Sequence, residues 1–121
     1  MGVVRRFLER LTETDEERLS DEIRGWAAAV GGATPIAEAP DRRQVRVAGV
    51  IKRLTVFPVD DAESLEVLLY DGTAELVATF MGRRGIEGLT LGTKVMLDGV
   101  IGEQRGQRRM LNPRLEFSAS R

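Results

Sequence analysis

The chain has 121 residues, of which 42% are hydrophobic and 31% charged, with a formal net charge of −1. This size and balance predict one soluble globular domain rather than a disordered chain. It contains neither Cys nor His, which excludes disulfides, thiol nucleophiles, and the commonest general base and transition-metal ligand. Phosphate-cradling loops and serine nucleophile elbows are also missing from the sequence. We therefore expect no enzyme activity, no metal and no cofactor.

The charge is unevenly distributed along the chain. Residues 1–41 contain five Arg against nine acidic residues, a net charge of −4, whereas residues 42–121 contain thirteen basic against ten acidic residues, a net charge of +3. A mildly basic second part is compatible with a polyanionic partner. The sequence shows no targeting signal and no apolar run long enough for a membrane helix, so we expect a cytoplasmic protein without a membrane partner.

The first 30 residues have helical periodicity. Phe7, Leu8 and Leu11 form a short apolar stripe, and Thr14 with Glu17 forms a capping box, which is typical of a helix N-terminus. A longer stripe follows and ends at the helix-stopping glycines 31–32. We predict an N-terminal amphipathic helical extension over 1–32 and an extended linker over 33–43. The longer stripe comprises Leu19, Ile23, Trp26, Ala27 and Val30.

From residue 44 the apolar residues recur at period two, which predicts strands and a β domain over 44–121. Gly49 lies inside the first strand, where it indicates a bulge or a close backbone approach. Gly106 marks a turn, residues 82–89 fit a short helix or coil, and Pro113 interrupts the last strand, as an edge strand tolerates. The predicted strands cover residues 44–54, 65–70, 74–81, 94–102 and 108–117.

A two-residue turn at Asp71-Gly72 would pair Tyr70 with Thr73 and join the second strand to the third. Alternation along both strands then assigns each side chain to a face. The inward set is Leu65, Val67, Leu69, Leu76, Ala78 and Phe80, and the outward set is Glu66, Leu68, Tyr70, Glu75, Val77 and Thr79.

Several short motifs occur in a characteristic order over residues 44–117: V-R-V-A-G-V at 45–50, L-Y-D-G-T-A at 69–74, L-x-L-G-x-K-V at 89–95, L-x-G at 97–99 and M-L-N-P at 110–113. On these motifs the segment resembles bacterial OB-fold nucleic-acid-binding domains, such as the wedge domain of RecG-type helicases and the anticodon-binding domains of class II tRNA synthetases. The resemblance covers about 60% of the chain. It implies an all-β, five-stranded OB-fold barrel with an oligonucleotide surface on strands two and three.

We expect this surface to bind single-stranded or branched DNA or RNA, mainly through cations that contact phosphates. Tyr70 is the aromatic of the outward set and would stack on a base. Phe57 would add a second stacking platform, although core or loop packing is the more common role of such a residue. The expected phosphate contacts are Lys52, Arg53, Arg83, Arg84, Arg105, Arg108 and Arg109.

Other interpretations remain open at this point. The cations would also fit an ordinary solvated surface, and the near-neutral charge with Glu66 on the outward face favours a protein-interaction module. A carboxylate-metal hydrolase would depend on Asp60, Asp61 and Glu63 in one loop. The helix would pack on the flank or the open end of the barrel. Alternatively, it would cover the outer patch of Leu68, Val77 and Tyr70, or mediate contact with a partner protein or a second copy.

Overall fold

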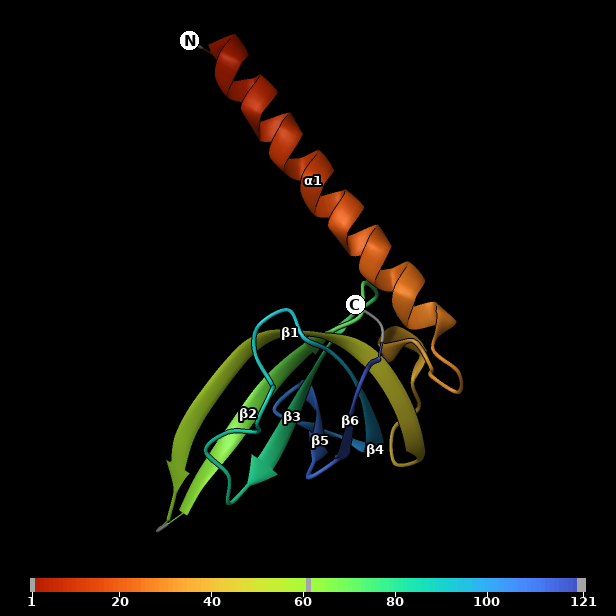
Figure 1. The fold of residues 1–121 in the computed structure, drawn as a ribbon, viewed down its shortest axis with the longest axis vertical. Helices are drawn as coiled ribbons and strands as arrows, with labels where there is room; N and C mark the ends of the chain where they lie inside the picture. The colour runs from red at the N-terminus through yellow and green to blue at the C-terminus, as the bar shows by residue number, and fades with distance from the viewer. Residues whose placement is uncertain (1, 61, 120–121) are drawn as a thin grey trace.

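The computed structural model describes residues 2–60 and 62–119, with side chains described from Asp15 onward except that of Val59. Over these residues the chain is mostly β, with one long helix at its N-terminus (Figure 1). The elements in chain order are α1 (Gly2–Ala29), the 3-10 helix η1 (Ile36–Glu38), β1 (Gln44–Val59), β2 (Ala62–Tyr70), β3 (Glu75–Met81), β4 (Lys94–Gln104), β5 (Gln107–Leu111) and β6 (Arg114–Phe117).

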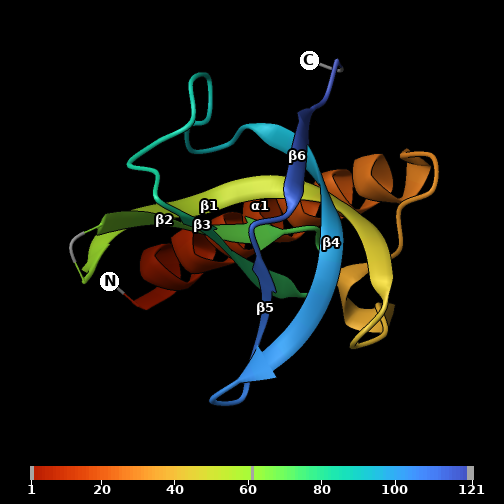
Figure 2. The same ribbon diagram turned by 90° about the horizontal axis from the view of Figure 1, so that it is seen from below.

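Five of the strands close into a ring in the order β1-β2-β3-β5-β4, with β4 returning to pair with β1 (Figure 2). All neighbours are antiparallel except β3 and β5, which run parallel. The single fifth strand expected over 108–117 is divided, because Asn112 has a φ of 48° and Pro113 follows it. The second piece, β6, leaves the ring and pairs antiparallel with β4.

Strand β1 pairs with two different strands of the ring, one along each part of its length. Its first part, residues 44–50, pairs with β4, and its second part, residues 50–59, pairs with β2. The β-bulge lies between Ile51 and Arg53, so Gly49 is not the bulge. It is instead a close approach, because a Cβ there would lie 2.7 Å from the Tyr70 carbonyl oxygen and 2.9 Å from Leu69 Cγ. Of the two interpretations of Gly49, the close approach is correct.

The turn between β2 and β3 is longer than predicted, but the assignment of faces is correct. Tyr70 pairs with Glu75, so the connection has four residues, 71–74. A difference of two residues moves the register by a whole period of the strand and leaves each side chain on its predicted face. The six residues of the inward set are all buried in the core. Val77 of the outward set is also buried.

The loop of residues 82–93 is fully described and contains turns but no helix. Gly82, Gly88 and Gly92 have φ values of 75°, 84° and 86°, which a helix does not accommodate. Leu89 of this loop is buried in the core and Ile86 packs against it. The loop therefore closes one part of the ring without regular structure.

The N-terminal residues form one continuous helix. The capping box at Thr14 and Glu17 lies inside α1 and does not begin a new helix, since an N-cap residue must leave the helical conformation. The stop at the glycine pair is confirmed: α1 ends at Ala29 and Gly32 has a φ of 77°. No helix in the described part of the chain is long and apolar enough to cross a membrane.

Only the C-terminal part of α1 packs on the ring, and its N-terminal end runs away from it (Figure 1). Ile23 and Ala27 are buried where the helix contacts the outer face of β1. Trp26 has the ammonium group of Lys94 5.1 Å from its ring centre. The helix therefore lies on the flank of the ring, which was one of the placements expected from the sequence.

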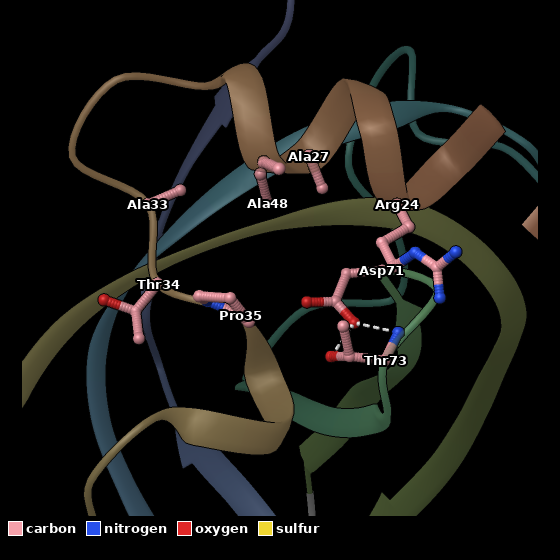
Figure 3. A pocket seen from close by; sticks show the side chains of 9 residues that line it. Arg24, Ala27, Ala33, Thr34, Pro35, Ala48, Asp71 and Thr73 are labelled. Atoms are coloured by element: carbon pink, nitrogen blue, oxygen red, sulfur yellow. Dashed lines mark hydrogen bonds between the residues drawn. The ribbon is translucent and has the colours of Figure 1, made fainter. Parts of the chain in front are cut away.

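Asp71 joins the segment that follows α1 to the β2–β3 connection (Figure 3). Its carboxylate is 2% exposed and accepts hydrogen bonds from the backbone N–H groups of Ile36 (2.8 Å), Thr73 (2.8 Å) and Ala74 (3.1 Å). It also accepts one from the Thr73 hydroxyl at 2.6 Å. Residues 33–43 are therefore fixed to the ring through η1.

Candidate functional site

A groove of about 640 Å³ crosses the outer face of β2, β3 and β5. On one side it is bounded by the second part of β1, and on the other by the turn between β4 and β5. Its lining includes Phe57, Glu66, Thr79, Arg105, Arg109 and Leu111.

The floor of the groove contains an ion pair between Arg109 and Glu66, which the strand register brings together. Glu66 pairs with Thr79 across β2 and β3, and Thr79 pairs with Leu111 across β3 and β5. This places Arg109 beside them, and its Nη1 donates to Glu66 Oε2 at 3.1 Å and to Thr79 Oγ1 at 3.4 Å. Its buried Nε has no hydrogen-bond partner among the described residues. The guanidinium is therefore fixed in place with part of its donor capacity unused.

The walls of the groove combine an aromatic ring, aliphatic side chains and a cation. Phe57 pairs with Ser64, which puts it on the same face as Glu66, and it is half-buried. Leu111 is 65% exposed and Val100 is 49% exposed. Arg105 is exposed in a tight turn, where it and Gly106 have φ values of 54° and 76°, as a two-residue hairpin turn requires.

Arg108, one of the expected phosphate contacts, is turned away from the groove. Its Nη1 donates to the Ile36 carbonyl at 2.6 Å and its Nη2 to the Ala39 carbonyl. It also pairs with Asp41 at 3.1 Å. Since neighbouring residues on a strand point to opposite faces, Arg108 and Arg109 cannot both face the groove. Arg108 is therefore a structural residue that fixes the η1 segment to β5.

The pair at residues 83–84 lies in the loop after β3 and does not line the groove. Arg84 Nε is 2.7 Å from Glu63 Oε2, and Arg83 is exposed. Glu63 thus neutralises Arg84 in the described structure. The arrangement resembles an ordinary surface ion pair more than a prepared phosphate site.

Tyr70, Lys52 and Arg53 do not line the groove, and Tyr70 and Lys52 lie near the helix. The Tyr70 hydroxyl donates to Ser20 Oγ at 3.1 Å, and the Lys52 ammonium stands 4.6 Å from the centre of the Tyr70 ring. Arg53 is exposed next to the bulge. Tyr70 is four positions after Glu66 in β2, which is a distance of about 13 Å along the strand. Tyr70 and the groove are therefore two separate places on the same face.

The hydrolase interpretation rests on Asp60, Asp61 and Glu63. Asp61 lies outside the described residues, and Glu63 is paired with Arg84. The part of the chain that the structure describes contains no group of three side chains placed to hold a metal ion.

Comparison with known proteins adds no assignment. No protein-family model matches the chain, and no curated protein matches it at a significant level.

Proposed function

We propose that residues 44–117 form an OB-fold module that binds single-stranded or branched nucleic acid in the groove, without catalysis. OB folds bind oligonucleotides on the face of strands two and three, between the loops that follow strands one and four. The groove lies over β2 and β3, between the end of β1 and the β4–β5 turn. This coincidence of strand order and groove position is the observation that carries the proposal.

The fold departs from the expected pattern at two points. The expected fifth strand is divided into β5 and β6. The short helix that an OB barrel has between its third and fourth strands is absent from residues 82–93. This segment, whose start fitted a short helix or coil, is a glycine-containing loop, and Leu89 fills the core from there. The loop lies outside the groove, so this departure leaves the proposed binding face intact.

The groove supplies the chemistry that a single strand needs. Arg105 is exposed and can follow a phosphate, whereas Arg109 is already oriented by Glu66 and would exchange that carboxylate for a phosphate oxygen. Phe57 offers a ring for a base, and such stacking contributes about 1–3 kcal/mol per base. With two cations, the logarithm of affinity should fall with the logarithm of salt at a slope of about −1.4.

A second candidate is a protein-interaction module of the same fold. It is favoured by the exposed Leu111 and Val100 and by Glu66, which offsets the charge of Arg109. This candidate predicts a partner that is insensitive to salt and no affinity for nucleic acid.

The proposal is tested by fluorescence anisotropy with labelled single-stranded DNA, single-stranded RNA and a forked duplex, each at two salt concentrations. We expect binding that weakens at the higher salt and that is reduced on all three probes by the double substitution Arg105→Ala with Arg109→Ala. The matched control is Arg18→Ala with Arg114→Ala, which removes the same charge from exposed positions outside the groove.

Equal losses in the two double variants would show that only net charge matters and would refute the groove as the site. Absence of binding by the folded wild-type protein at low salt would refute nucleic-acid binding and favour the interaction module. Circular dichroism of each variant establishes that the fold is retained.

A further inference from the structure

We propose that the chain associates with a second copy of itself through α1. The two helices pack antiparallel, and the first half of each lies against a second groove beside α1 of the other copy. This interface is separate from the nucleic-acid groove and does not depend on it.

The second groove has a volume of about 450 Å³ and lies between α1, β1 and the start of β4. Its aliphatic wall is formed by Leu19, Ile23 and Val50. Charged groups also line it: Glu22 from the helix, and Lys52 and Lys94, whose ammonium groups stand over the rings of Tyr70 and Trp26. Leu19 is 58% exposed although it belongs to the apolar stripe of the helix. An aliphatic groove with an exposed leucine at its edge is typical of a surface that another helix covers.

The occupant is suggested by the part of α1 that leaves the ring. The 28 residues of α1 span about 42 Å at the usual rise per residue, and the N-terminal end projects from the ring (Figure 1). The first eleven residues contain Val3, Val4, Phe7, Leu8 and Leu11. A projecting helix of about a dozen residues is only marginally stable in water and is usually stabilised by packing.

The distribution of charge along α1 favours a second copy of this chain as the partner, with the two helices antiparallel. Residues 2–11 contain three Arg and one Glu, whereas residues 12–22 contain six acidic residues and one Arg. A parallel pair would bring like charges together along its whole length. An antiparallel pair places the basic half of each helix beside the acidic half of the other, and a two-fold axis then forms every contact twice.

The spacing of two leucines gives a register. Leu8 and Leu19 are eleven residues apart, about three helical turns, so they occupy one face of α1. An antiparallel pair centred between residues 13 and 14 puts Leu8 of each copy opposite the partner's Leu19. The same register puts Arg5 opposite the partner's Glu22, which lines the second groove.

The first experiment measures molar mass by sedimentation equilibrium over a wide range of protein concentration. We expect a reversible dimer, and Leu19→Asp should raise its dissociation constant by about tenfold or more. The matched control is Leu111→Asp, because Leu111 is equally exposed but lies in the other groove. A wild-type protein that stays monomeric at every concentration overturns the proposal, and so does a dimer that tolerates Leu19→Asp.

Two further experiments test whether the two helices are antiparallel: an exchange of charges between variants, and distance measurements between spin labels. The triple variant Arg5→Glu, Arg6→Glu, Arg10→Glu and the triple variant Glu17→Arg, Asp21→Arg, Glu22→Arg should each be monomeric, and their mixture should form a heterodimer. The chain has no Cys, so spin labels can be placed singly at Thr12→Cys or Gly2→Cys. An antiparallel pair gives a short distance for the first and roughly 35 Å for the second; short distances for both would overturn the antiparallel arrangement.

Discussion

Replacing Asp71 by Ala should be among the most destabilising single changes in the domain. The carboxylate is 2% exposed and satisfies three backbone N–H groups and one hydroxyl. The amide of Ile36, itself fully buried, would lose its acceptor and have no water to replace it. Each buried donor left unsatisfied costs about 1–3 kcal/mol. The other donors, in the part-buried turn, recover some solvation, so the expected loss is about 3–5 kcal/mol.

The substitution Asp71→Asn tests the two carboxylate oxygens separately, because it replaces only one of them by an NH₂ group. The amide keeps one acceptor for the 73–74 backbone but presents an NH₂ group to the N–H of Ile36, so an intermediate loss of about 1–3 kcal/mol is expected.

The assay is urea denaturation followed by circular dichroism and by the fluorescence of Trp26, the single Trp of the chain. The exposed Glu87→Ala serves as control and should change the free energy of unfolding by less than about 0.5 kcal/mol. A loss below about 1 kcal/mol for Asp71→Ala would refute the hydrogen-bond argument.

Three further outcomes follow from the packing and the groove. Gly49→Ala should destabilise by at least about 2 kcal/mol, since its methyl group would meet a backbone carbonyl, whereas Gly102→Ala has open space and should stay within about 0.5 kcal/mol in the same urea titration. Ile23→Ala should cost about 2–3 kcal/mol and change Trp26 fluorescence by loosening α1 from β1; an unchanged signal would contradict the described docking. Glu66→Gln should raise affinity for single-stranded nucleic acid in the anisotropy assay, because it releases Arg109; lower affinity would argue against phosphate contact there.

The strands and their faces could be predicted from the sequence because period-two patterns report which side of a strand is buried. The faces of β2 and β3 were correct even though their connection was two residues longer than predicted, since only the parity of the register matters. The continuity of α1 was missed because a capping box reports only a local preference, which the surrounding helix overrides.

The site was less predictable because basic residues close in sequence point in different directions. Arg108 and Arg109 are neighbours in β5, yet one fixes η1 and the other lies in the groove. Tyr70 contacts the helix, and no local pattern indicates that Ser20, fifty residues earlier, would be its partner. Phe57 reaches the groove only because β1 continues to Val59 instead of ending before a loop. These placements depend on how the strands close into a ring. The residue pattern within a single segment carries no information about that closure.

The double role of β1 has a kinetic consequence. Its pairing with β2 joins residues close in sequence, but its pairing with β4 joins residues 44–50 to residues 94–100, about half the chain away. Closing the long loop between β1 and β4 costs conformational entropy before their hydrogen bonds and side-chain contacts can form. We therefore expect β1, β2 and β3 to associate early in folding and the ring to close late. Substitutions at the β1–β4 seam should then accelerate unfolding with little effect on the refolding rate, whereas those between β1 and β2 should slow refolding.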